Sequence, residues 1–202
     1  MEEGFHKVPG GKIIIEKRLG DIEIEQIKKH KRCTEISLWH TKHKDLNFLE
    51  ILSKLNAAAF YGVQVHDYQA LTKINTLERV FLNRIKNHED LSFINQLENI
   101  RELDLLYLPK LEKFPDLSNC KKLTRIRIWN CKRLANIENL SLIPNLEELN
   151  IVETPQKPDD LEFLAKLNHI KYISAQFGST KANKEFEDLL AKYGKTLHRP
   201  LW

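Results

Sequence analysis

The chain has 202 residues, of which 42% are hydrophobic and 30% charged, with 32 Lys and Arg against 28 Asp and Glu and a formal net charge of +4. This is the composition of an ordinary globular protein, and without a run of about 18 apolar residues the sequence excludes a membrane-spanning helix. The N-terminal stretch shows no secretory signal pattern, and three cysteines form no paired disulfide framework. We therefore expect a cytoplasmic protein.

Residues 1–23 are predicted to form an N-terminal cap. Two β-prone runs in "KIIIEKRLGDIEIE" lie on either side of Gly20 and Asp21. Such runs around a short polar turn are typical of a β-hairpin, or of a strand followed by a turn. We expect this segment to cover one end of the apolar core that follows.

Residues 24–178 form about seven repeats with a period of 22–24 residues. Each repeat has an apolar anchor residue in a short segment with strand-like alternation, such as Ile126 in "TRIRI". The equivalent anchors are Ile36, Ala58, Val80, Leu103, Ile126, Leu149 and Ile173. Apolar, Ala or Cys residues also recur two positions after each anchor and three, six and nine positions before it, with His30 as the exception. This regularity indicates one structural unit that repeats.

The spacing within a repeat predicts its shape. The alternating segment is a strand of about four residues, and the threefold spacing before it favours a 3₁₀ or short helical return. A unit this small cannot bury its apolar side alone, so stacked units must share a core between a parallel sheet and a layer of helical turns. The pattern "LxxLxLxxNxxLxxLxxLxxL" resembles that of leucine-rich-repeat proteins of the short-repeat, internalin-like bacterial type. The resemblance implies an α/β solenoid with seven short parallel strands on its concave side and helical turns on its convex side.

The chain departs from the family pattern five residues after each anchor, where the family carries an Asn that bonds the backbone of the turn. This chain has Thr41, Val63, Ile85, Leu108, Cys131, Thr154 and Gly178 there. Thr and Cys can supply a weaker donor, but Val, Ile and Leu cannot. We therefore expect a less regular turn, or a bound water, after the strands.

Residues 179–202 are predicted to form a capping helix and a tail. Four apolar side chains share one face of the segment 180–193, namely Phe186, Leu189, Leu190 and Tyr193. Ser179 or Thr180 can cap the start of this helix, and Gly194 can end it. Because both ends of the array carry caps, we expect the chain to be a whole protein.

Three residues of each strand are expected to face away from the core, one before, one after and three after the anchor. The first row is Glu35, Ala57, Arg79, Glu102, Arg125, Glu148 and Tyr172. The second row is Ser37, Ala59, Phe81, Asp104, Arg127, Asn150 and Ser174. The third row is Trp39, Tyr61, Asn83, Leu106, Trp129, Val152 and Gln176, with Tyr107 one residue further along.

The charges of the first two rows are predicted to neutralise one another. Arg125 has Glu102 and Glu148 as neighbours, and Arg127 lies beside Asp104, so cross-strand ion pairs are favoured over phosphate contacts. A nucleic-acid groove presents an unbalanced positive stripe instead. The basic run "KKHKR" at residues 28–32 is interpreted as a solvated face rather than a nucleic-acid contact.

The third row is unusually apolar for exposed positions. Aromatic and aliphatic side chains beside paired charges are typical of protein–protein contact surfaces, so we predict a protein partner there. The predicted partner-binding residues are Trp39, Tyr61, Phe81, Leu106, Tyr107, Arg125, Arg127, Trp129 and Val152. The alternative is that the caps or loops cover Trp39 and Trp129 and bury them.

The sequence favours a non-catalytic protein-binding module that takes no cofactor. It shows no Ser/His/Asp or Cys/His grouping, and His40 and His43 near Cys33 match no usual zinc spacing. The resemblance to stand-alone bacterial repeat proteins implies one concrete hypothesis, an immunity (antitoxin) protein that blocks a cognate toxin.

Other roles stay open, as does the oligomeric state. A regulatory subunit docked on an enzyme presents the same kind of surface. Residues 108–134 also resemble the Cys- and Pro-containing repeats of plant immune receptors, which implies a sensor domain. The alternative of another class is a nucleic-acid-binding protein, which rests on the basic run and on Arg125 and Arg127.

Overall fold

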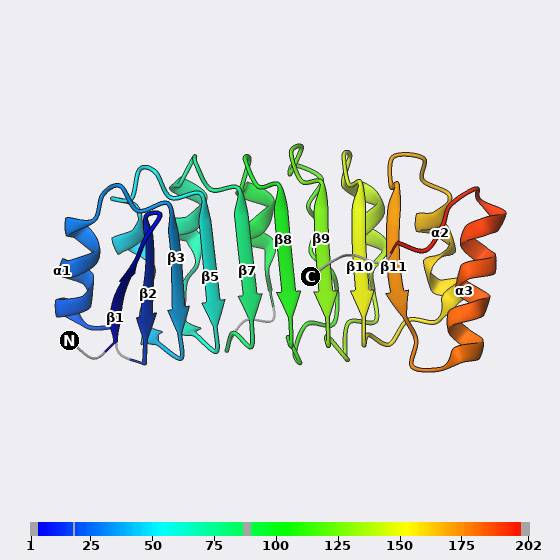
Figure 1. Ribbon diagram of the computed structural model, residues 1–202, viewed down its shortest axis with the longest axis horizontal. Helices are drawn as coiled ribbons and strands as arrows, with labels where there is room; N and C mark the ends of the chain where they lie inside the picture. The colour runs from blue at the N-terminus through cyan, green and yellow to red at the C-terminus, as the bar shows by residue number, and fades with distance from the viewer. Residues whose placement is uncertain (1–3, 18, 87–89, 199–202) are drawn as a thin grey trace.

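The computed structural model describes residues 4–17, 19–86 and 90–198, and nine strands from these residues form one sheet. Figure 1 shows the strands side by side along the long axis, with helical segments behind them and a helix at each end. In spatial order they are β1 (Phe5–Val8), β2 (Lys12–Glu16), β3 (Glu35–Trp39), β5 (Ala57–Tyr61), β7 (Arg79–Asn83), β8 (Glu102–Leu106), β9 (Arg125–Trp129), β10 (Glu148–Val152) and β11 (Tyr172–Gln176). A second, two-stranded sheet pairs β4 (Lys42–His43) with β6 (Gln64–Val65).

The register of the sheet follows the repeat of the sequence. The predicted anchors pair with one another from β3 to β11, all in parallel, so that Leu103 pairs with Ile126 and Ile126 with Leu149. This confirms the predicted solenoid. One further parallel strand belongs to the N-terminal cap, because β2 sets Ile13 against Ile36.

Helical turns lie behind the strands and complete the repeats. They are α1 (Asp21–Lys29), the 3₁₀ turns η1 (Asn47–Leu49), η2 (Gln69–Lys73), η3 (Ser92–Gln96), η4 (Glu138–Leu142) and η5 (Pro158–Leu161), and the short helix α2 (Glu162–Ala165). The fully described repeat between β8 and β9 has no helical turn. Its sequence contains Pro109 and Pro115, and proline cannot donate the backbone hydrogen bond of a helical turn.

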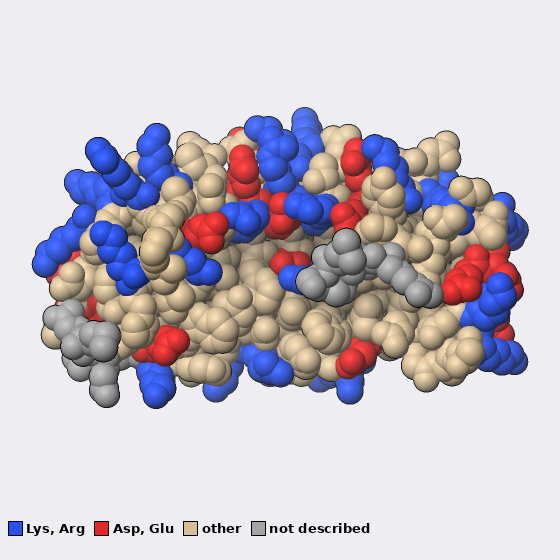
Figure 2. Space-filling model, in the orientation of Figure 1, with Lys and Arg blue, Asp and Glu red and all other residues tan. Residues whose placement is uncertain are grey.

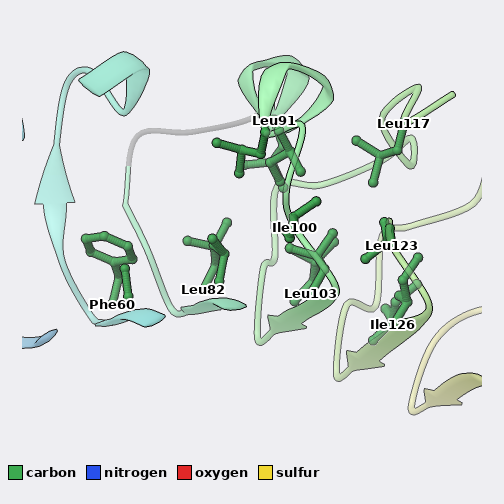
Figure 3. Close-up of a cluster of buried hydrophobic side chains, with 14 of the residues drawn as sticks. Phe60, Leu82, Leu91, Ile100, Leu103, Leu117, Leu123 and Ile126 are labelled. Carbon is green, nitrogen blue, oxygen red and sulfur yellow. The ribbon is translucent and has the colours of Figure 1, made fainter. Parts of the chain in front are cut away.

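The core lies between the two layers. Figure 3 shows side chains from strands, such as Leu82, Leu103 and Ile126, meeting others from the returning segments, such as Leu91 and Leu117. Alternation along β9 buries both Ile126 and Ile128. Burying one such aliphatic side chain contributes about 1.5–3 kcal/mol, so the continuous core supplies the main stabilisation of the array.

The turns that leave the strands are regular, which corrects the expectation drawn from the missing Asn column. The residue four positions after the anchor is left-handed in repeat after repeat, at Lys17, His40, Gly62, Arg84, Tyr107, Asn130 and Glu153, with φ between 51° and 65°. From Lys17 to Asn130, the N–H of this residue donates to the last residue of the next strand, as Tyr107 N does to the Trp129 carbonyl at 2.8 Å. The turn is therefore held by its backbone, and the next position is free to be a core residue such as Val63 or Leu108.

The N-terminal cap differs in part from the prediction. The hairpin joins β1 to β2 through Gly10 and Gly11, which have φ of 86° and 82°, and not through Gly20 and Asp21. The second β-prone run is instead the helix α1, whose first turn is fixed by a 2.8 Å bond from the Gly20 N–H to the Glu23 carboxylate. The helix buries Ile27 in the core, so it also serves as the helical layer of the first repeat.

The C-terminal helix α3 (Thr180–Lys192) lies where the sequence places it. The Ser179 hydroxyl accepts a 3.1 Å bond from the Ala182 N–H, which makes Ser179 the capping residue of the two candidates. Phe186 and Leu190 are buried against the last repeat, and Gly194 follows with φ of 67°. Across the described ranges, no helix combines the length and the apolar character that crossing a membrane requires.

Candidate protein-binding surface

The predicted outward rows form one surface, which we name the open face: the outward residues of β3, β5, β7, β8, β9, β10 and β11. The parallel register aligns each row across neighbouring strands, so Trp39 pairs with Tyr61 and Leu106 with Trp129. Figure 2 views this face and shows acidic and basic side chains alternating in a band across its upper part. The surface below the band carries few charges.

Three aromatic side chains on β3, β5 and β7 form an aromatic cluster: Trp39, Tyr61 and Phe81. The rings of Trp39 and Tyr61 stack with centroids 3.7 Å apart and 8° between their planes. Tyr61 in turn contacts Phe81 at 4.8 Å with a 37° tilt. All three side chains are half-buried, so one edge of each is held by its neighbours while another stays accessible. The cluster is therefore assembled without a partner.

The predicted cross-strand ion pairs are confirmed for both arginines of β9. Arg127 binds Asp104 in a bidentate manner, with Nε to Oδ1 at 2.8 Å and a terminal nitrogen to Oδ2 at 2.7 Å. Arg125 donates to the Glu102 carboxylate. Burial raises the pKa of Asp104 while the hydrogen bond from Arg127 lowers it, and the burial effect is the larger. These cations are engaged on the surface itself, so they are poor candidates for phosphate binding.

The charged and aromatic parts of the face are in contact. The Arg127 guanidinium lies 5.8 Å from the centre of the Phe81 ring. Burial raises the pKa of Tyr61, and the nearby Asp104 carboxylate adds to that effect. A rigid ion pair beside stacked rings gives the face both apolar area and fixed polar groups, which is the composition of energetic centres in protein interfaces.

The other two predicted aromatic residues are Tyr107, which follows β8, and Trp129, which ends β9. Trp129 is 39% exposed, which rules out its burial by described loops. Tyr107 lies 6.0 Å from Trp129 between ring centres and carries the Arg84 guanidinium at 3.9 Å on its ring. Trp129 and Val152 line a hollow of about 600 Å³ in front of β9–β11. This hollow is large enough for a side chain of a partner.

Solved structures with the same arrangement are leucine-rich-repeat proteins. An internalin (InlF) of Listeria monocytogenes superposes with a TM-score of 0.58 at 19% sequence identity, over 88% of this chain and 52% of its own. Internalin C2 of the same bacterium gives a TM-score of 0.56 at 18% identity, over 80% of this chain and 71% of its own. A leucine-rich-repeat protein of Leptospira interrogans gives 0.55 at 20% identity, over 79% and 40%. The chain folds as a leucine-rich-repeat solenoid.

The solenoid spans about half the length of the first of these internalins. No family model and no curated protein sequence matches it. Identities below 25% establish the shared fold, and the partner must be inferred from the surface of the solenoid itself. Within the described ranges, no group of three His, Cys, Asp or Glu side chains is placed to hold a metal ion.

One predicted contact residue of the solenoid has little surface to offer. Leu106 is 5% exposed, and its neighbours in the third row are Asn83 and Trp129. It packs beneath the face rather than on it, which corrects the assumption that this row is exposed throughout. Arg125 remains exposed and Val152 half-buried.

Sequence reasoning missed two features of the open face. Arg79 reaches across Ala57 to the Glu35 carboxylate at 2.7 Å rather than to the adjacent Glu102. It spans a hollow of about 190 Å³ over Ala57 and Ala59, whose small side chains leave the space open. Two alanines at outward positions of one strand were the available signal. The second feature is His198, whose ring lies 4.9 Å from that of Tyr172 and whose Nε2 lies 3.7 Å from Glu148.

Proposed function

We propose that the solenoid is a non-catalytic protein-binding module that holds a folded partner against its open face. The observation that carries this proposal is the accessible aromatic surface beside charges that already neutralise one another. A partner recognised here gains affinity from apolar contact and shape, because the local cations are bound to local carboxylates. Seven strands about 4.8 Å apart span about 29 Å, which suits one face of a small domain.

The finer form of the proposal concerns the partner. We propose a cytoplasmic toxin or another enzyme, which the solenoid inhibits by covering it, as an immunity protein does. Three free and buried cysteines support a reducing compartment. A regulatory subunit that docks on an enzyme would use the same surface without blocking its activity.

Site-specific cross-linking tests the surface. A photoreactive phenylalanine analogue at position 129 places the probe on the open face, and the same analogue at position 142 places it on the helical side. Trp129 and Leu142 are comparably exposed, at 39% and 48%, so both probes are accessible to a protein in solution. We expect one protein of the source cell to be cross-linked from position 129 and not from position 142. Equal cross-linking from both positions would contradict the proposal.

Matched substitutions and an activity assay complete the test. Trp129→Ala should lose capture of that protein, and Leu142→Ala should retain it. The purified partner is then assayed for its own activity with and without an equimolar amount of the solenoid. Loss of activity supports inhibition, whereas unchanged activity would rule out the inhibitory form and leave a regulatory or scaffolding role.

A further inference from the structure

A second surface of the solenoid lies at its N-terminal end. A hollow of about 460 Å³ opens between the β1–β2 hairpin and the loop that follows α1. Its lining carries six cationic side chains and no carboxylate: Lys7, Lys12, Lys28, Lys29, Lys31 and Arg32. Figure 2 shows Lys and Arg gathered at this end of the molecule, on the upper left. We name this feature the basic hollow.

Five of the six cations of the basic hollow have no ion pair with a described residue. Lys28 alone among the six has a recorded ion pair with a described residue, at 2.7 Å from Glu25. On the repeats, by contrast, Arg125, Arg127 and Lys171 each pair with a carboxylate of the neighbouring repeat. These three cations are therefore neutralised by their neighbours, whereas most cations of the basic hollow are not.

Helix stabilisation accounts for part of this concentration only. Lys28 and Lys29 lie in the last turn of α1, where cations interact favourably with the helix dipole. Lys7 and Lys12 come from the hairpin, and Lys31 and Arg32 follow the helix, so the dipole gives no reason for them. A multivalent anion in the hollow would be attracted by several of these charges at once.

The two segments that supply these cations are fixed to each other. Thr34 N donates to the Gly11 carbonyl at 2.8 Å, and the Thr34 hydroxyl donates to the Gly10 carbonyl at 3.2 Å. Gly11 has φ of 82°, and a Cβ added to it would lie 3.0 Å from the Thr34 hydroxyl oxygen, so the hairpin backbone packs tightly against the loop. The floor is apolar, with Ile13 and Cys33 both buried. The basic hollow is thus a preformed recess rather than a set of independent surface side chains.

We propose that the basic hollow binds a compact, phosphate-rich anionic group, either on a soluble polyphosphorylated small molecule or as the head group of an anionic lipid. Several Lys side chains act as point charges around one multivalent anion. An extended nucleic acid fits less well, because it needs cations that continue along a groove. On the same edge of the following repeats, Arg101 and Lys171 are already paired with Glu78 and Glu147.

The test compares two charge reversals of equal size on the full chain. Lys31→Glu with Arg32→Glu alters the basic hollow, and both residues are exposed, so folding should be retained. Lys121→Glu with Lys122→Glu is the matched control, since these residues form an exposed basic pair at another repeat. Binding of inositol hexakisphosphate is measured by titration calorimetry. Flotation with phosphatidylcholine vesicles, with and without phosphatidylinositol bisphosphate, measures the lipid source.

We expect wild-type protein to bind at least one of the two probes. The hollow variant should bind that probe at least about tenfold more weakly, and the control variant should bind it within about twofold of wild type. Binding of the soluble probe alone, or of the lipid alone, would identify the source. Binding of neither probe, or equal weakening in both variants, would overturn the proposal. Because Trp129→Ala leaves the hollow intact, the outcome is independent of partner binding at the open face.

Discussion

The stack of Trp39 on Tyr61 allows a quantitative test of the claim that the open face is assembled before any partner arrives. The ring centres are 3.7 Å apart, and Tyr61 also contacts Phe81 at 4.8 Å. An aromatic pair contributes about 0.5–1.5 kcal/mol beyond the area that it buries. Tyr61→Ala removes both contacts together with a large side chain that is half-buried. We therefore expect the free energy of unfolding to fall by about 2–3 kcal/mol.

The pairwise part of that loss is isolated by a double-mutant cycle. Trp39→Ala, Tyr61→Ala and the double variant are unfolded in urea and followed by far-ultraviolet circular dichroism, which does not depend on the removed fluorophore. We expect a coupling energy of about 1 kcal/mol between positions 39 and 61. The control cycle pairs Trp39→Ala with Trp129→Ala, whose effects should add to within about 0.5 kcal/mol because the three strands β5, β7 and β8 lie between them. A coupling at 39 and 61 no larger than in the control would refute a preassembled cluster.

Three further predictions concern the core, a buried carboxyl and the cysteines. Ile126→Ala should lower the free energy of unfolding by about 2–5 kcal/mol, and a loss below about 1 kcal/mol would contradict its place in the core. Burial raises the pKa of Asp104 above its ordinary 3.8, so the stabilisation that Asp104 gives relative to an Asn variant should be greatest below that pH. This stabilisation should decline as the pH rises through the folded-state pKa of Asp104. Urea unfolding of wild type and Asp104→Asn across acidic pH measures it. A stabilisation that increases with pH would show that the ion pair with Arg127 outweighs burial. Burial raises the pKa of Cys131 to about 11 and of Cys120 to about 12, so iodoacetamide at pH 8 should modify these thiols in urea but not in the native protein. Modification of the native protein would show that these segments open.

The repeat columns predicted the sheet because they record a physical constraint that every unit shares. An anchor such as Ile126 must be apolar and must alternate with exposed neighbours, so its spacing fixes strand, register and face together. The outward rows followed from the same alternation. Leu106 shows the limit of that inference, because its outward position in the row does not leave its side chain exposed.

Local ambiguity explains the errors. The run "IEIE" alternates like a strand, but Gly20 and Glu23 form a helix start, and the spacing of Ile24 and Ile27 also suits a helix face. The turns were judged by their side chains, whereas the structure holds them by a left-handed residue and a backbone bond. The choice of ion-pair partner could not be predicted either, because nothing in the sequence indicates that Arg79 extends past Ala57 to Glu35.

The position of the two candidate surfaces follows from the architecture of a repeat array. In the interior, each outward charge has a neighbour about 4.8 Å away on both sides, so uncompensated charge there is costly and pairing is the stable arrangement. The basic hollow lies at the end of the array, between the hairpin and the loop after α1, and five of its six cations have no ion pair with a described residue.

Salt should therefore separate the two surfaces. Partner binding at the open face rests on apolar and paired groups, so its dissociation constant should change by less than about threefold between 50 and about 300 mM NaCl. Binding of inositol hexakisphosphate at the basic hollow should weaken at least about tenfold over the same range, because released counterions drive it. Titrations of the two ligands on one protein preparation measure both slopes. If the dissociation constant of the partner rose steeply with NaCl concentration, and did so in Trp129→Ala as well, the partner would bind at the charged end of the solenoid and not on the aromatic face.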